Sequence, residues 1–185
     1  TIGVMGFGTE RIEEDIARLF PGVPVSRMDL DTTRSRNAYE QIIDDFSKGK
    51  NKILIGTQMI TKGLDFDHVS VVGILSADQM MNFPDFRAHE RAFQMMEQVS
   101  GRAGRKNRNG VVVLQTSDPS SPLIQQVIAH DYEGMYNRQL AERKAFSYPP
   151  YTRLIYVYLK HRDETLLQEL AVRYTTALRE VFGAR

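Results

Sequence analysis

The apolar residues of the first fifty positions recur at helical spacing in two stretches. One stretch predicts a helix over residues 9–20, with acidic residues in its first turn, where negative charge suits a helix N-terminus. The other predicts a helix whose apolar stripe runs from Tyr39 to Phe46 and which ends at Gly49. Its candidate caps are Asp31, Thr32 and Thr33. A short strand, residues 23–27, is expected between the two helices.

Three later apolar runs lack alternation, as expected of strands that are covered on both faces. These runs span residues 53–57, 69–75 and 111–115. A helical pattern at about residues 86–102 separates the last two runs. Strands that alternate with helices predict an α/β fold, with a mostly parallel sheet and helices on both of its faces.

The pattern changes in the last quarter of the chain. A helical pattern over residues 121–140 is followed by Tyr-Pro-Pro-Tyr at 148–151, where two prolines cannot continue a helix. Residues 154–160 then alternate as a half-exposed strand, and a final helical pattern follows. We therefore expect residues 1–147 to form one domain and residues 148–185 to be the truncated start of a small α+β domain.

Composition excludes several classes of protein. The 185 residues contain no cysteine, so disulfides and thiolate-bound metals are excluded, and the four histidines have no metal-ligand spacing. We expect no metal site in this chain. The longest apolar run is too short to cross a membrane and no signal-peptide pattern opens the chain, so we expect neither a membrane segment nor a signal peptide. With 24 basic and 23 acidic residues, the chain also lacks the basic excess of a typical nucleic-acid-binding protein, so any basic site must be local.

One basic stretch follows the predicted helix at 86–102. On a continuing helix, Gln98, Arg102 and Arg105 fall within roughly 60° of one another, and Arg87 and Arg91 lie on the same stripe. Guanidinium groups stay charged and can bind phosphate oxygens in a bidentate manner. A solvated basic helix end that complements the helix dipole is an equally good explanation of the spacing alone.

A second candidate site follows the strand at 53–57. The carboxyl end of a parallel strand is where α/β sheets place ligands, and Gly56, Thr57, Lys62 and Gly63 bring small residues, a hydroxyl and a cation there. An ordinary strand-to-helix loop would contain the same residue types.

The chain lacks the parts that a complete nucleotide hydrolase needs. No Gly-x-x-x-x-Gly-Lys-Ser/Thr loop is present, and the segment 76–79 has no Asp-Glu pair after its strand. These residues alone cannot hold magnesium and activate a water. If they serve nucleotide hydrolysis, they must act together with another lobe.

Taken together, the two basic or glycine-containing stretches resemble a known family. The stretch GTQMITKGLDF at 56–66 resembles motif V, and QVSGRAGR at 98–105 resembles motif VI, of superfamily 2 helicases. Further stretches resemble the primosomal replication-restart helicases of bacteria; they are GFGTER at 6–11, RMDLDTT at 27–33, DFRAHER at 85–91 and YPPY at 148–151.

The resemblance implies a second RecA-like lobe, of the P-loop NTPase type, in a two-lobe motor. ATP and Mg²⁺ would lie at the interface with a first lobe outside this chain, and the family's zinc module would also lie outside it. In the family, arginines of motif VI stabilise the charge on the γ-phosphate, and this role falls on Arg102 and Arg105, with Gln98 orienting the site. Gly63 and Asp65 would lie near the nucleotide.

The same resemblance implies a 3′–5′ DNA helicase that restarts stalled replication forks and takes part in primosome assembly. Thr57, Gln58 and Lys62 are the candidates for binding single-stranded DNA. Implied partners are forked and single-stranded DNA, primosome proteins and single-stranded-DNA-binding protein, in the bacterial cytoplasm at the nucleoid. We expect a monomer, and we expect this fragment alone to be inactive.

Two other functions stay open on the sequence. A double-strand DNA translocase or an RNA helicase would share motifs V and VI. A non-catalytic module would use the same arginines only to hold nucleic acid or a partner protein.

Overall fold

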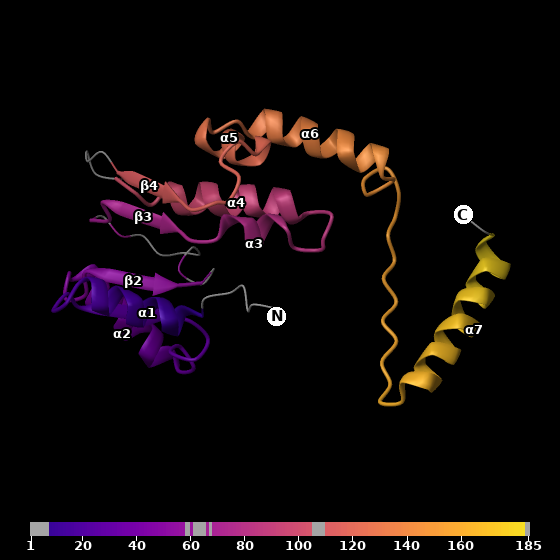
Figure 1. Ribbon diagram of the computed structural model, residues 1–185, viewed down its shortest axis with the longest axis horizontal. Coiled ribbons are helices and arrows are strands. Elements are labelled where there is room, and N and C mark those ends of the chain that lie inside the picture. Colours follow the sequence, from indigo (N-terminus) through magenta and orange to yellow (C-terminus); the bar gives the residue numbers. More distant parts are fainter. Residues whose placement is uncertain (1–7, 58–59, 61–65, 67, 105–109, 184–185) are drawn as a thin grey trace. The chain divides into compact units, whose positions relative to one another are not determined.

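The computed structural model describes residues 8–57, 60, 66, 68–104 and 110–183 (Figure 1). The chain divides into two compact units, one that extends to Glu142 and one from Arg143 onward. The elements of the described part, in chain order, are α1 (Thr9–Leu19), β1 (Val25–Met28), α2 (Arg36–Ser47), β2 (Ile53–Gly56), β3 (Val71–Ile74), α3 (Ala77–Met81), α4 (Ala88–Ser100), β4 (Val111–Leu114), α5 (Pro122–Ile128), α6 (Tyr132–Ala145) and α7 (Glu164–Phe182).

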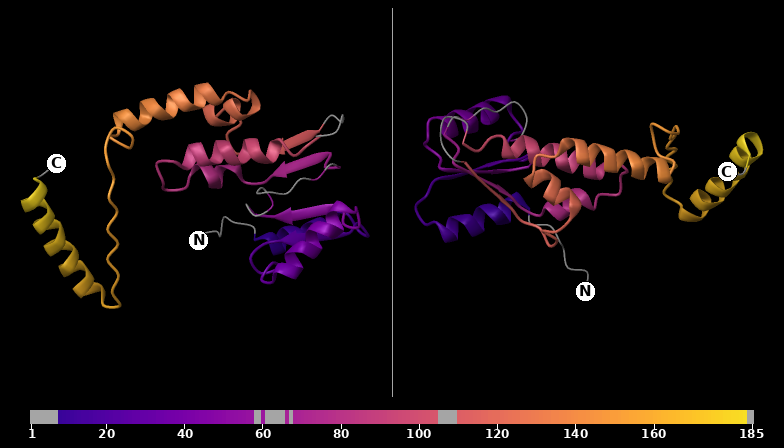
Figure 2. Two further views of the ribbon diagram at one scale, coloured as in Figure 1. Left: turned by 180° about the vertical axis from the view of Figure 1, so that it is seen from behind. Right: turned by 90° about the horizontal axis from the view of Figure 1, so that it is seen from above.

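The first unit contains two parallel strand pairs. Strand β1 pairs with β2, from Val25 opposite Ile53 to Met28 opposite Gly56. Helices α1 and α2 lie on opposite sides of this pair (Figure 2). The core here is formed by Met28, Phe46 and Phe66, and the two phenylalanine rings meet edge to face with their centroids 4.7 Å apart.

Strands β3 and β4 form the second parallel pair, from Val71 opposite Val111 to Ile74 opposite Leu114. Helix α4 packs against β3, α3 and α5. Its inward face has the three-to-four-residue spacing of an amphipathic helix, with Ala92, Phe93 and Met96 buried. The predicted α/β class with parallel strands and helices on both faces is confirmed.

The helices differ from the sequence prediction in two places. The helix expected over 121–140 is interrupted, because His130 takes a positive φ of 53° and the side chain of Asp131 accepts a hydrogen bond from the N–H of Gly134 at 2.8 Å. A new helix, α6, therefore begins at Tyr132. The short helix α3 was not predicted at all, since five residues carry too little periodicity to reveal it.

The cap of α2 was also predicted at the wrong residues. Ser35 is the N-cap, and its hydroxyl accepts from the backbone N–H of Ala38 at 3.2 Å. Thr32 and Thr33 instead bond to Asp29 in the turn after β1, so they are not available to the helix. A threonine hydroxyl can bond either within a turn or to the first turn of a helix, and here both threonines bond within the turn.

The second unit contains the end of α6, an extended segment and α7. Residues 154–160 are extended and mostly exposed, and they pair with no strand in the part of the chain that the structure describes. Helix α7 begins at its cap Asp163, whose side chain accepts from the N–H of Leu166 at 3.1 Å. The assignment of residues 148–185 to a separate C-terminal domain stays a prediction. Among the described helices, none has the length and apolar character to cross a membrane.

Candidate functional site

Helix α4 ends at Ser100, and a tight turn follows it. The backbone N–H of Arg102 donates to the carbonyl oxygen of Val99 at 3.0 Å, and the N–H of Ala103 donates to Ser100 at 3.1 Å. Gly104 then takes a φ of 73°, a left-handed conformation that favours glycine. Arg102 is half-buried and lies on this turn.

The prediction that Gln98, Arg102 and Arg105 share one helical flank is therefore wrong for Arg102. The helix stops at its cap Gly101, two glycines within four residues being poor helix formers. Gln98 lies on α4 itself and is exposed. Arg105 lies outside the described residues.

The turn is attached to the amino-terminal end of β3. The N–H of Gly104 donates to the carbonyl oxygen of Val69 at 2.9 Å, two residues before the strand begins. The neighbouring carbonyl oxygen of Ser70 accepts from Val111, the first residue of β4, also at 2.9 Å. Arg102 is thus positioned where both strands start.

The other two arginines of the predicted stripe belong to the opposite end of α4. Arg91 donates from Nη1 to Oδ2 of Asp85 at 2.8 Å, and Nε of Arg87 lies 3.8 Å from Oδ1 of the same carboxylate. The backbone N–H of Arg87 also donates to Asp85, at 2.8 Å, and this bond is the main cause that lowers the pKa of Asp85. A helix of thirteen residues is roughly 18 Å long, so these arginines and Arg102 form separate groups.

The second candidate site begins at the carboxyl end of β2. Gly56 is the last residue of the strand, and Thr57 follows it with its side chain exposed. A side chain at position 56 would lie 2.6 Å from the carbonyl oxygen of Met28 and 2.8 Å from Cγ2 of Ile60, so only glycine fits there. The remaining predicted residues, Gln58, Lys62, Gly63 and Asp65, lie outside the described part of the chain.

An unpredicted polar network stands beside Thr57, at the carboxyl end of β1. Asp29 is buried, with 8% of its surface exposed, and its carboxylate accepts from the hydroxyl of Thr9 at 2.5 Å and from the N–H of Thr32 at 3.0 Å. Nε of Arg27 lies 3.4 Å from this carboxylate and 3.3 Å from that of Glu13. The Thr9 hydroxyl, then the Thr32 amide, lower the pKa of Asp29 to about 2.

Sequence reasoning had a signal for this network but did not use it. Thr9 and Asp29 both lie in stretches that resemble the family, yet neither was proposed as a contact. The signal was a carboxylate placed directly after the apolar end of a strand, where an unpaired charge would be costly.

A second hydrogen-bonded aspartate, Asp78, joins the carboxyl ends of β3 and β4. Asp78 accepts hydrogen bonds from the hydroxyl of Thr116 and the N–H of Ser117, both at 2.8 Å, and the Ser117 bond is the main cause that lowers the Asp78 pKa. Ser76, between β3 and α3, takes a left-handed conformation with a φ of 55°. Asp78 therefore has a structural role that its place after a strand did not reveal.

The two candidate sites lie at opposite ends of the strands. Strands β2 and β3 point the same way in both Figure 1 and Figure 2. Thr57 follows the carboxyl end of β2, whereas Arg102 is tied to the amino-terminal end of β3. A four-residue strand is roughly 13 Å long, so the two residues are attached to well-separated strand ends. The unit therefore presents a hydroxyl at the carboxyl end of one strand and a guanidinium near the amino-terminal end of another.

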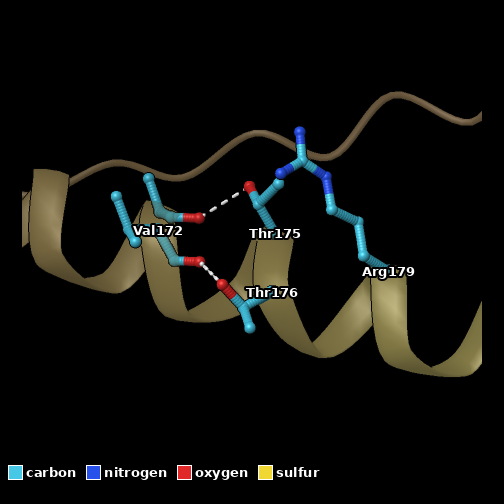
Figure 3. Close-up of a pocket in the computed structure, with 5 residues that line it drawn as sticks. Val172, Thr175, Thr176 and Arg179 are labelled. Atoms are coloured by element: carbon cyan, nitrogen blue, oxygen red, sulfur yellow. Dashed lines mark hydrogen bonds between the residues drawn. The ribbon is translucent and has the colours of Figure 1, made fainter. Parts of the chain in front are cut away.

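Further properties of the described residues concern metal binding and a hollow on α7. Within the described ranges, no group of three or more His, Cys, Asp or Glu residues could hold a metal ion. A shallow hollow on α7 is lined by Val172, Thr175, Thr176 and Arg179 (Figure 3). Both threonine hydroxyls there donate to carbonyl oxygens of the same helix, at 2.7 and 3.0 Å, so their donor capacity is used within the helix.

Comparison with known proteins identifies the class. Residues 4–107 match the helicase conserved C-terminal domain, and the chain belongs to that family. Its motifs are those of the C-terminal lobe of superfamily 2 helicases.

Within this class the chain is similar to the replication restart protein PriA. It is 48% identical to PriA of Bacillus subtilis (strain 168), over 88% of this chain and 20% of that protein. Identity is 44% to PriA of Synechocystis sp., over 81% of this chain and 18% of that protein, and 40% to PriA of Haemophilus influenzae, over 90% and 23%. The chain thus spans about a fifth of the length of these relatives.

A solved structure is also similar. The C-terminal domain of the DEAD-box protein Dbp5 aligns over 75% of this chain and 64% of that chain, at 22% identity and a TM-score of 0.40.

Proposed function

We propose that this chain is the second motor lobe of an ATP-dependent 3′–5′ DNA helicase that restarts stalled replication forks. The observation that best supports this is the separation of Arg102 and Thr57 to opposite ends of the strands. A motor protein binds its nucleotide at one surface and its DNA at another. Hydrolysis at the nucleotide surface can then change how tightly the DNA surface binds.

Arg102 is the proposed arginine finger, together with Arg105, and Gln98 helps to orient the site. A guanidinium that meets the charge developing on a transferring phosphoryl group is worth about 10³–10⁵ in rate. The turn after α4 supports this role for Arg102, because three backbone hydrogen bonds hold residues 102–104. A preorganised donor costs little reorganisation at the moment of reaction.

ATP and Mg²⁺ are proposed to bind mainly to a first lobe outside this chain. Gly63 and Asp65 of this lobe are proposed to lie near the nucleotide. Zinc is likewise assigned outside the chain, since these 185 residues contain no cysteine thiolate. We expect no measurable ATPase from the chain alone.

Single-stranded DNA is the proposed ligand of the other edge, through Thr57, Gln58 and Lys62. A hydroxyl at the carboxyl end of a strand can donate to a phosphate oxygen, a contact that sets position without reading bases. The formal net charge of +1 fits a few local contacts, and predicts weak, salt-sensitive DNA binding by the chain alone.

The finger role is tested by Arg102→Ala in the full-length protein. We expect steady-state ATP hydrolysis at saturating ATP and DNA to fall by about 10³-fold or more. Arg18→Ala is the matched control, because Arg18 is an exposed arginine on α1 and its removal should leave turnover unchanged. If the Arg102→Ala protein hydrolyses ATP at the normal rate, the finger assignment is wrong and a purely binding function is favoured.

The direction of travel and the substrate need a separate test. The test compares unwinding of forked DNA that carries either a 3′ or a 5′ single-stranded tail. We expect unwinding only of the substrate on which the protein can move in the 3′–5′ direction. Translocation on duplex DNA without unwinding, or activity on RNA alone, would favour the translocase or RNA helicase. We propose that the protein works in the bacterial cytoplasm at the nucleoid, as a monomer, with primosome proteins and single-stranded-DNA-binding protein.

A further inference from the structure

Gly110, which directly precedes β4, touches the backbone of the turn that contains Arg102. A methyl group added at Gly110 would lie 2.5 Å from the backbone nitrogen of Gly104 and 2.7 Å from Cβ of Ala103. It would come closer still to the carbonyl carbon of Ala103. Real side chains do not approach backbone atoms so closely, so either the turn or the start of β4 would have to move.

A glycine is needed here because of the space at the contact. The three atoms nearest to an added Cβ belong to Ala103 and Gly104 of the turn. An alanine at position 110 would therefore meet the turn itself. Backbone atoms cannot rotate away as a flexible side chain can.

We propose that Gly110 is a positioning residue that sets the place of Arg102 relative to the nucleotide. The inference rests on the proposed finger role of Arg102. Two restraints hold the turn: the Gly104 N–H bond to Val69 on one side and the contact with Gly110 on the other. A Cβ at position 110 pushes on Ala103 and Gly104, the two residues that follow Arg102, and strains the bond to Val69.

The start of β4 has less room to yield than the turn. Val111 is already in register with Val71, and its N–H donates to the carbonyl oxygen of Ser70 at 2.9 Å. The strand is thus fixed by the ladder immediately after Gly110, whereas residue 102 is outside any helix or strand. We therefore expect the displacement to appear at Arg102.

The first experiment compares Gly110→Ala with Gly73→Ala in the full-length protein. Gly73 lies in the middle of β3, and a side chain there would meet nothing within 4 Å, which makes it the matched control. A misplacement of about 1 Å can cost about 10²-fold in rate. We expect kcat for DNA-stimulated ATP hydrolysis to fall by about that factor in Gly110→Ala and to stay within about twofold in Gly73→Ala.

The same samples must show that only the catalytic geometry has changed. We expect the nucleotide KM and the affinity for single-stranded DNA of Gly110→Ala to match those of Gly73→Ala. The melting transition should stay cooperative but have a lower midpoint, because the contact with the turn costs stability. A Gly110→Ala protein that has also lost DNA binding and its melting transition would mean that Gly110 is needed for folding, and the positioning proposal would be overturned.

A double-mutant cycle with Arg102→Ala separates this inference from the proposed function. If Gly110 acts through Arg102, the change Gly110→Ala costs little further activity once the arginine is gone, so the two effects are not additive. Additive effects would show that Gly110 acts elsewhere. If Arg102→Ala alone leaves hydrolysis intact, the finger role fails; if only Gly110→Ala leaves it intact, the finger role stands and the positioning role fails.

A rescue experiment tests the steric mechanism. Ala103→Gly removes the Cβ of the turn but leaves its backbone atoms, which lie closest to the added methyl group. We expect Ala103→Gly to restore little of the activity lost in Gly110→Ala. Full restoration would mean that only side chains were in conflict, and the backbone contact would then have no role in placing Arg102.

Discussion

The hydroxyl of Thr9 donates a 2.5 Å hydrogen bond to the carboxylate of Asp29, and so joins the first turn of α1 to the end of β1. The two residues are 20 positions apart. Arg27 lies against the same carboxylate and against Glu13 of α1, so helix and strand are connected twice. This network is adjacent to Thr57, because Met28 and Gly56 are register partners at the ends of β1 and β2.

A pH-dependent contribution to stability follows from this bond. The usual pKa of an aspartate, near 3.8, falls to about 2 at Asp29, chiefly through the Thr9 hydroxyl. A lowered pKa in the folded state contributes stability that is complete above about pH 4 and is lost as the pH falls toward 2. We expect Thr9→Val to lower the free energy of unfolding of the 185-residue chain at pH 7 by about 1.5–3 kcal/mol.

Urea denaturation of the wild type and Thr9→Val at several pH values between 2 and 7 measures this effect. The difference between the two proteins should shrink as Asp29 becomes protonated. Thr9→Ser keeps the hydroxyl and is the control, with most of the stability retained. An equal difference between wild type and Thr9→Val at pH 7 and pH 2 would show that packing, and not the hydrogen bond, explains the loss.

Gly56→Ala should destabilise the first strand pair. The added Cβ would press on the Met28 carbonyl oxygen and on Ile60, and overpacking of this kind costs about 1–3 kcal/mol. Since Thr57 follows directly, we also expect weaker binding of single-stranded DNA by the full-length protein. Gly73→Ala serves as control for both measurements. Normal stability and normal DNA affinity in Gly56→Ala would contradict the tight contact.

Asp85 should stabilise the start of α4 by its hydrogen bond to the backbone as well as by its charge. Asp85→Ala removes both the bond to the Arg87 N–H and the ion pair with Arg91, and we expect a loss of about 1 kcal/mol in unfolding free energy. Asp85→Asn keeps an oxygen that can accept from Arg87, so it should lose less. Chemical denaturation of both variants measures the two losses in unfolding free energy. Equal losses would show that Asp85 stabilises the helix through its charge alone.

Ser76 has a left-handed backbone conformation that favours glycine and disfavours β-branched residues. Its φ of 55° and ψ of 52° are left-handed, and the next residue, Ala77, donates to the carbonyl oxygen of Gln115 at 3.0 Å, which fixes the chain on the far side of the turn. Non-glycine residues in this region cost about 1–2 kcal/mol, most for β-branched side chains. We expect Ser76→Gly to be tolerated and Ser76→Val to lower the urea midpoint. Equal midpoints would contradict a fixed left-handed turn.

Much of the fold was predictable because the local pattern and the tertiary structure agree. The runs at 53–57, 69–75 and 111–115 each contain a parallel strand, as predicted. The expected burial on both faces does not hold for β3 and β4, because Val71, Val111 and Val113 are exposed. The predictions failed where two local structures compete. Thr32 and Thr33 could cap a helix or close a turn. The turn forms because the Asp29 carboxylate accepts from the Thr32 N–H and the Asp29 carbonyl oxygen accepts from the Thr33 hydroxyl.

The sequence by itself determined the α/β class, the order of most elements and the membership of the helicase family, because periodicity and short motifs are properties of neighbouring residues. Only the tertiary structure decided that Arg102 lies on a turn at the amino-terminal end of β3 while Thr57 lies at the carboxyl end of β2. It also decided that Gly110 packs against that turn and that Asp29 bonds to Thr9. These relationships depend on how strands, helices and turns pack in three dimensions, which periodicity and short motifs do not report.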